Sequence, residues 1–242
     1  MCTFSGLFNR RSPTARRMLK LYSVEKDDQP SGIDREGLLD ALLKLARSQF
    51  GENTEYFDIY GPYGIPKGQP VRLEAFLSRL KERGHNRYQG YRGYSPSDND
   101  DLVSRFGFRT SFDSPSSEGY KLNTVVIDWL ADDFQLDEAT VVRQISASLP
   151  VSYGFSEDIP ELFDVLAESP FKRPLLGSVS TSTNANYQAW QRRSSGLLDG
   201  EIRGIYSRNY LTELQLRHRD CRHMTDPEKV ADGLYVANRK PQ

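Results

Sequence analysis

The most compact group of potential metal ligands in the sequence is His218, Cys221 and His223. Imidazole and thiolate are ligands that zinc prefers, and Asp220 would be the nearest fourth ligand. Three arginines lie among these residues and would repel a bound cation: Arg217, Arg219 and Arg222. We therefore predict no metal site and interpret the stretch as a solvated basic segment.

The sequence lacks the common catalytic motifs. We find no Gly-x-Ser-x-Gly nucleophile elbow, no His-Glu-x-x-His and no Rossmann glycine fingerprint. The stretch from Gly61 to Lys67 has the glycines of a phosphate-binding loop, but Pro62 and Pro66 remove amide donors and no Lys-Ser or Lys-Thr pair follows. We therefore predict a protein that is not an enzyme, without catalytic residues or cofactors. One alternative remains open, namely an enzyme whose site is assembled from scattered Asp, Glu, Arg and His residues.

A second candidate for chemistry is the segment Arg87–Tyr94, in which cationic and aromatic side chains are interleaved with glycines. Such a segment can stack bases and pair with phosphates, or it can supply rigid anchors to a protein partner. A third interpretation is a loop whose rings fold back onto the core. We predict partner binding here and in an earlier tyrosine-rich loop, through Tyr88, Tyr91, Arg92, Tyr94, Tyr60 and Tyr63.

Composition and charge argue against several classes of function, among them nucleic-acid binding and membrane association. The chain has 242 residues, 37% of them hydrophobic, and a formal net charge of −1. A nearly neutral chain has no global field that attracts nucleic acid or anionic lipid. Two distant cysteines, Cys2 and Cys221, indicate a reducing compartment. No apolar run reaches the roughly 18 to 20 residues of a membrane span. We therefore expect a cytoplasmic protein without a membrane partner, and the charge argues against nucleic acid.

The strand–helix–strand unit Tyr120–Phe155 is the clearest structural signal among the elements that must position these residues. Its first strand places Val125, Ile127 and Trp129 on one face. Its helix begins at Asp137 and ends before Pro150. The apolar stripe of that helix comprises Val141, Val142, Ile145 and Leu149. We expect this unit to lie at the middle of a sheet.

The remaining elements follow from hydrophobic period and turn residues. Before the central unit we predict a strand Met18–Val24, a helix from Ser31 or Asp34 to Phe50, a strand Tyr56–Tyr60, a helix from Pro70 to Gly84, a long loop His85–Asp101 and a strand Leu102–Phe112. After it we predict a helix Ile159–Ala167, a helix Tyr187–Arg193, a strand Glu201–Tyr206, a helical turn Leu211–Leu216 and a strand Gly233–Ala237.

These elements mix without strict alternation, which is typical of the α+β class. We predict a mixed, largely antiparallel sheet with helices packed on one face and two strand–helix–strand units that suggest a pseudo-duplication. Residues 1–17 carry four arginines without an apolar region, so we predict a disordered tail, or translation from Met18. Residues 18–242 then form a single domain with sub-halves 18–119 and 120–242.

The stretch Ile202–Thr212 carries a family resemblance. A strand with a basic-Gly-hydrophobic run, followed by Asn-aromatic-Leu-Thr and a short helix, resembles the C-terminal part of immunity proteins from type VI secretion and polymorphic toxin systems. The stretch Leu149–Phe155 is similar to the same part. The resemblance covers about the second half of the chain. It implies a bacterial, cytoplasmic antitoxin that binds one cognate toxin and occludes its active site by protein–protein interaction.

Three functional hypotheses therefore follow from the sequence. The first is a binding protein of the immunity type. The second is a nucleic-acid-binding module that combines residues 87–94 with the cationic strand face of Arg105 and Arg109. The third is the enzyme described above. Affinity that falls steeply with salt would indicate the second hypothesis, and a deep pocket with converging carboxylates or histidines would indicate the third.

Overall fold

The structure is a computed structural model. It describes residues 16–50, 55–61, 64, 69–97, 100–116, 119–160, 163–165, 168–172, 180–181 and 184–241. In the described part of the chain, no helix is long and apolar enough to cross a membrane.

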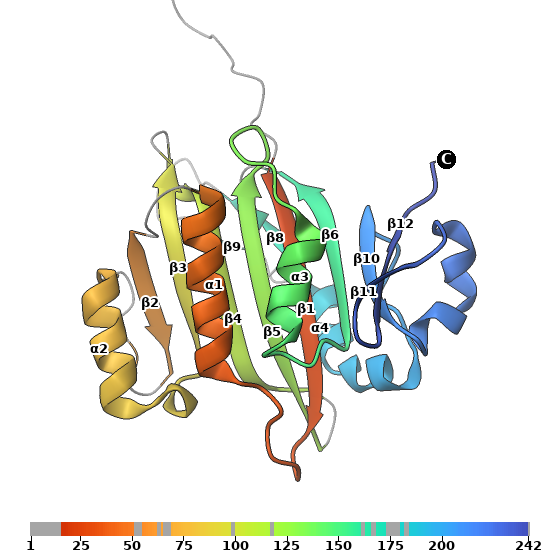
Figure 1. Ribbon diagram of the computed structural model, residues 1–242, viewed down its shortest axis with the longest axis horizontal. Coiled ribbons are helices and arrows are strands. Elements are labelled where there is room, and N and C mark those ends of the chain that lie inside the picture. The colour runs from red at the N-terminus through yellow and green to blue at the C-terminus, as the bar shows by residue number, and fades with distance from the viewer. Residues whose placement is uncertain are drawn as a thin grey trace, which may run out of the picture.

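A large sheet forms the centre of the molecule, in the order β2-β3-β4-β5-β1-β6-β10-β12-β11 (Figure 1). Every pair of neighbouring strands in it is antiparallel. The predicted α+β class with a largely antiparallel sheet is confirmed. The strands of this sheet are β1 (Arg16–Lys26), β2 (Tyr56–Tyr60), β3 (Gly90–Ser97), β4 (Asp100–Pro115), β5 (Tyr120–Leu130), β6 (Tyr153–Ile159), β10 (Arg208–Thr212), β11 (Glu228–Ala231) and β12 (Leu234–Asn238).

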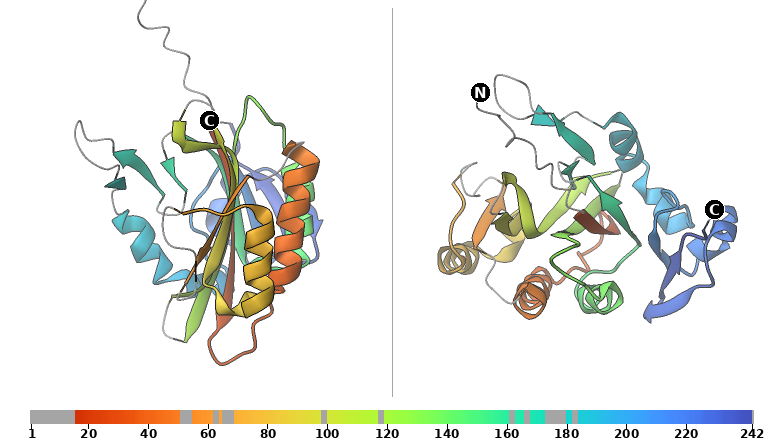
Figure 2. Two further views of the ribbon diagram at one scale, coloured as in Figure 1. Left: turned by 90° about the vertical axis from the view of Figure 1, so that its left-hand side faces the viewer. Right: turned by 90° about the horizontal axis from the view of Figure 1, so that it is seen from above.

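Three helices cover one face of the sheet, and they are α1 (Arg35–Phe50), α2 (Leu73–Arg83) and α3 (Glu138–Ser146) (Figures 1 and 2). Asp34 and Asp137 begin α1 and α3 by accepting backbone N–H groups from Gly37 and Thr140. The predicted apolar stripe of α3 and the predicted face of β5 are buried in the main core. There they join the buried side chains of α1, among them Leu38, Leu42, Leu45 and Ala46. In α2 the buried side chains are Phe76 and Leu80, and Leu77 is 39% exposed.

The opposite face is covered by chain between β6 and β10, a layer that the prediction of helices on one face did not include (Figure 2). Its elements are β7 (Phe163–Asp164), β8 (Ser169–Lys172), β9 (Ser180–Thr181), α4 (Ala185–Gln191) and the 3₁₀ helix η2 (Ser194–Asp199). Val165, Trp190 and Leu197 pack there against the side chains of β1, β5 and β6. Both faces of β1 and β5 are consequently buried.

Both predicted strand–helix–strand units exist, but they differ in how many strands lie between the two strands that each helix connects. In the antiparallel sheet, β5 and β6 run parallel to each other on either side of β1, and α3 connects them. The strands β1 and β2 also run parallel and are connected by α1, but β5, β4 and β3 lie between them. Because β1 lies between two strands of the second sub-half, both sub-halves share one sheet.

Four predicted elements are wrong. The segment His85–Asp101 is not a loop but contains a 3₁₀ turn η1 (His85–Arg87) and β3. Ile159–Ala167 is not a helix, because β6 extends to Ile159 and β7 follows. Glu201–Tyr206 is not a strand, and the strand lies instead at β10. Leu211–Leu216 therefore begins as strand and reaches only the 3₁₀ turn η3 (Gln215–Arg217); a second turn, η4 (Arg219–His223), follows.

The boundary of the predicted tail also shifts. Residues 1–15 lie outside the described residues, but Arg16 and Arg17 belong to β1. The side chain of Arg16 is 2% exposed and forms an ion pair with the equally buried Asp128. Arg17 donates from Nε to Glu138 at 2.5 Å. These pairs hold the start of β1 against β5 and α3, so the folded part begins by residue 16.

Candidate functional site

Three of the predicted partner-binding residues converge on the sheet face away from α1, α2 and α3. Phe57 and Ile59 of β2 point into the core under the helices, so Tyr56, Asp58 and Tyr60 point to the other face. The register places Tyr56 opposite Tyr94, Asp58 opposite Arg92 and Arg92 opposite Arg109. We define the Tyr/Arg patch as Tyr56, Tyr60, Arg92, Tyr94 and Arg109.

Cations and rings are in direct contact within the Tyr/Arg patch. The guanidinium of Arg92 lies 3.8 Å from the ring centroid of Tyr94, and the rings of Tyr94 and Tyr56 have centroids 5.7 Å apart. Burial and the charge of Arg109 lower the pKa of Arg92. Its Nε is buried without a hydrogen-bond partner among the described residues, and its terminal nitrogen donates to the Ser104 hydroxyl at 3.4 Å. No described carboxylate lies within 4 Å of Arg92, although Asp58 opposite it and the buried Asp128 are close enough to favour its charged form. Arg92 can therefore still form an ion pair with an anionic group.

Two other predicted contact residues belong to the core. Tyr91 is fully buried, and its hydroxyl donates to the backbone carbonyl of Arg35 at 3.0 Å. Tyr88 is 2% exposed and donates to the carbonyl of Arg79 at 3.0 Å. Burial argues against a partner contact by either side chain. The alternation of β3 places Tyr91 on the helix side, and Tyr88 is held against α2 by its hydrogen bond to Arg79. Tyr63 lies outside the described residues.

The structure also limits the nucleic-acid hypothesis. With Tyr88 and Tyr91 buried, the segment 87–94 keeps only Tyr94 as a ring near the surface for stacking. Arg105 pairs with Asp133 at 3.2 Å, and Arg109 lies 3.8 Å from Asp164. Both cations of the predicted strand face therefore have a carboxylate nearby.

A buried polar network that the sequence did not predict lies under α4. The side chain of Lys20 is fully buried and donates to Glu168 at 2.8 Å, to the carbonyl of Val165 at 3.1 Å and to the Tyr187 hydroxyl at 3.3 Å. Arg203 binds the same carboxylate of Glu168 through both terminal nitrogens. Burial lowers the pKa of Lys20 to about 8, although Glu168 opposes the shift. The network ties the second layer to β1.

One sequence signal was available for this network. Lys20 lies between Met18 and Tyr22 on one face of β1, and the other side chains at the centre of that face are hydrophobic. A charged side chain at such a position requires a buried partner. The identity of that partner was not predictable, because Glu168 and Arg203 are separated from Lys20 by well over a hundred residues.

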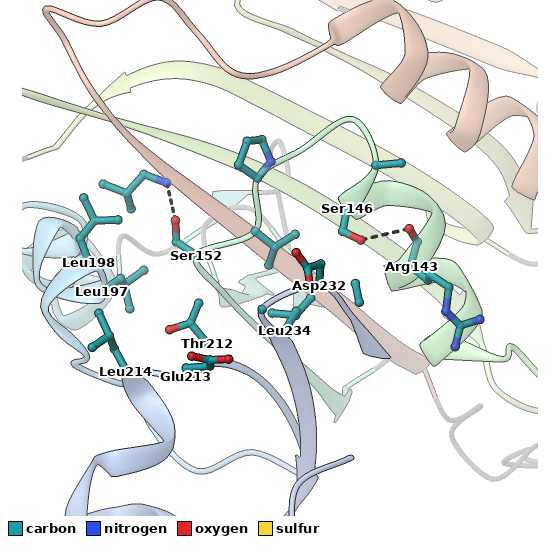
Figure 3. A pocket seen from close by; sticks show the side chains of 16 residues that line it. Arg143, Ser146, Ser152, Leu197, Leu198, Thr212, Glu213, Leu214, Asp232 and Leu234 are labelled. Atoms are coloured by element: carbon teal, nitrogen blue, oxygen red, sulfur yellow. Dashed lines mark hydrogen bonds between the residues drawn. The ribbon is translucent and has the colours of Figure 1, made fainter. Parts of the chain in front are cut away.

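A leucine-rimmed pocket of about 720 Å³ lies between the end of α3, the start of β6, η2 and the β11–β12 turn (Figure 3). In Figure 3, Leu197, Leu198 and Leu214 lie on one side of the pocket and Ser146 and Arg143 on the other. Leu198 and Leu214 are 37% and 52% exposed. The size suits a small ligand or an inserted apolar side chain. A short 3₁₀ helix and the loops beside it carry no periodic signal, so sequence reasoning missed this pocket.

The residues His218, Cys221 and His223 do not form a metal centre in this structure. In the described part of the chain, no three His, Cys, Asp or Glu side chains are placed to hold a metal ion. His218 Nδ1 accepts the backbone N–H of Asp220, and the Cys221 thiol donates to the carbonyl of Gln215 at 3.2 Å. Burial raises the pKa of Cys221, which disfavours the thiolate that a metal requires.

No protein-family model matches the chain, and no curated protein matches its sequence. The resemblance to immunity proteins at Ile202–Thr212 therefore stays a prediction, and it now concerns a loop followed by β10 rather than a strand followed by a helix.

Proposed function

We propose that this protein is a cytoplasmic immunity protein that binds a cognate bacterial toxin and occludes its active site. The observation that carries the proposal is the convergence of Tyr60, Arg92 and Tyr94 on one face of neighbouring strands. Tyrosine and arginine dominate the side chains that carry binding energy at protein interfaces. The resemblance in the second half of the chain supports the immunity role.

The Tyr/Arg patch has further properties of a protein interface. Its rings are mounted on sheet strands, so little conformational entropy is lost when a partner binds. Burial raises the pKa values of Tyr60 and Tyr94, so both hydroxyls stay neutral hydrogen-bond donors at physiological pH. The cation of Arg92 makes no ion pair within 4 Å in the described part of the chain, although Asp58 and Asp128 lie near it, and it favours an acidic group on the toxin surface.

The proposal is tested with the protein encoded by the neighbouring gene. Calorimetry measures whether the two proteins bind, and a growth-rescue assay measures whether this protein protects cells. The double variant Tyr60→Ala with Tyr94→Ala should stay folded and bind about three to six powers of ten more weakly, because each anchor is worth roughly 2 to 4 kcal/mol. Cells carrying it should lose protection.

Tyr235→Ala is the matched control. Tyr235 is a half-buried tyrosine of β12, at the far end of the sheet from the patch, and its loss should leave protection intact. Full protection by the double variant would exclude this patch as the interface. Failure of the parent protein to bind the neighbouring gene product would contradict the immunity role itself.

A further inference from the structure

A second pocket, of about 510 Å³, is lined by residues of β10, β12 and the turns η3 and η4. These elements lie at the end of the sheet opposite the Tyr/Arg patch (Figure 1, blue). The apolar part of the pocket lining that a ligand can reach comprises the half-buried Leu216 and Cys221 and the exposed Pro227, which we call the floor. Behind the floor lie the buried side chains of Leu211, Met224 and Ala237. The lining is strongly cationic, with Asp226 as the acidic side chain. We define the basic rim as Arg217, Arg219, Arg222 and Lys240.

The charges of the basic rim are largely uncompensated. No described carboxylate lies within 4 Å of Arg217, Arg222 or Lys240, and only Arg219 has one, Asp220, at 3.7 Å. Backbone carbonyls orient two of these cations. Arg222 Nε donates to the carbonyl of Arg219 at 2.9 Å, and Lys240 Nζ donates to the carbonyl of Arg222 at 3.0 Å. Carbonyls fix the side chains without neutralising their charge.

This concentration of positive charge stands out in a chain whose net charge is −1. Several uncompensated cations around one hollow repel one another, and an anion placed among them relieves that repulsion. Guanidinium groups match phosphate oxygens with paired hydrogen bonds, and a lysine adds a point charge. The apolar floor offers a surface on which a ring or an alkyl chain loses contact with water.

We propose that this pocket binds an organic phosphate, with one or more phosphate groups on the basic rim and an apolar ring or chain on the floor. The site is separate from the Tyr/Arg patch, which lies at the other end of the sheet. The proposed phosphate site therefore does not depend on the proposed immunity role.

Calorimetry with adenosine triphosphate as the probe, at about 50 mM salt, tests this assignment. We expect saturable binding, with adenosine at least tenfold weaker because it lacks the charge. Inorganic pyrophosphate should also bind at least tenfold more weakly, because it cannot use the floor. Arg217→Ala and Lys240→Ala should each weaken binding on the order of tenfold, the scale of one charge-assisted hydrogen bond.

Charge reversal supplies the matched control. Arg217→Glu should abolish binding, whereas Arg79→Glu, on the exposed face of α2, should leave it unchanged. Thermal unfolding of both variants establishes that each is folded. Absence of saturable binding by the parent protein would overturn the proposal, as would equal affinities of the two reversal variants. Pyrophosphate binding as tightly as the nucleotide would overturn the assignment of an organic ligand.

Discussion

At the residue scale, burial separates tyrosines that look alike in the sequence. Tyr91 and Tyr94 lie three positions apart in β3 and point to opposite faces of the sheet. Tyr91 contacts Phe76 and Phe112 edge-on, with ring centroids 6.1 and 5.5 Å away. Tyr94 instead lies half-buried under Arg92. One side chain therefore supports the fold, and the other is available for recognition.

Alanine at the two positions should distinguish these roles. Tyr91→Ala should lower the free energy of unfolding by about 3 to 5 kcal/mol, because it opens a cavity in the core and leaves the carbonyl of Arg35 without its donor. Tyr94→Ala should cost about 1 kcal/mol or less, the scale of an exposed cation–π contact. Urea denaturation of both variants measures the difference, and equal losses would contradict the burial of Tyr91.

Lys20 makes stability depend on pH. Its pKa is about 8 in the folded protein against 10.5 ordinarily. Between these values the unfolded chain binds more protons at this site, so the free energy of unfolding rises with pH. From pH 8 to about 9.5 the gain should be about 1 to 2 kcal/mol. The parent and Lys20→Met should be compared by urea denaturation across this range, since other groups contribute equally to both. A difference between the two that does not change with pH would refute the assignment.

At the scale of elements, β3 is a strand because its glycines allow close packing. A Cβ at Gly93 would lie 2.5 Å from the ring of Phe108 and 2.9 Å from the ring of Phe57. A Cβ at Gly90 would collide with the backbone carbonyl oxygen of Thr110 in β4. The glycines that lower the strand propensity of this segment are therefore required by the neighbours of the strand.

Gly90→Ala should consequently destabilise the protein by about 1 to 3 kcal/mol, because the colliding atoms are backbone and cannot rotate away. Gly107→Ala in the adjacent β4 is the control, since its Cβ would meet nothing nearer than an Asp128 oxygen at 3.4 Å. Thermal unfolding midpoints of the two variants provide the measurement. A Gly90→Ala variant as stable as Gly107→Ala would show that β3 does not approach β4 this closely.

At the scale of the whole molecule, Arg16 marks the N-terminal boundary of the folded part, because its side chain forms a buried ion pair. Its partner Asp128 lies near the middle of the sheet and is 1% exposed. Removing one member of a buried ion pair leaves the other charge without compensation, at a cost of about 3 to 5 kcal/mol. The first residues of β1 therefore determine more of the stability than their position near the terminus suggests.

Two truncations test this boundary. Deleting residues 1–15 should leave the unfolding midpoint within about 2 °C, because that sequence has no apolar period with which to dock. Deleting residues 1–17 should lower the midpoint by roughly 10 °C, since Asp128 loses Arg16. Differential scanning calorimetry of both proteins gives the comparison. Equal midpoints would show that the ion pair contributes little.

The sequence alone determined those elements whose side-chain period is regular. It predicted β1, α1, β4, β5 and α3, together with the core faces of β5 and α3, because alternation and helical period are local properties of the chain. The caps at Asp34 and Asp137 were also readable, since a capping side chain binds a backbone group three residues away.

Only the tertiary structure decided which candidate residues act together. Tyr60, Arg92 and Arg109 meet because β2, β3 and β4 pair in one register, and register depends on contacts far apart in the sequence. The same pairing buries Tyr91. The network around Lys20 and the basic rim likewise join distant segments, and hydrophobic period carries no information about such contacts. Sequence period specifies which face of an element is buried, whereas the pairing of elements specifies what that face meets.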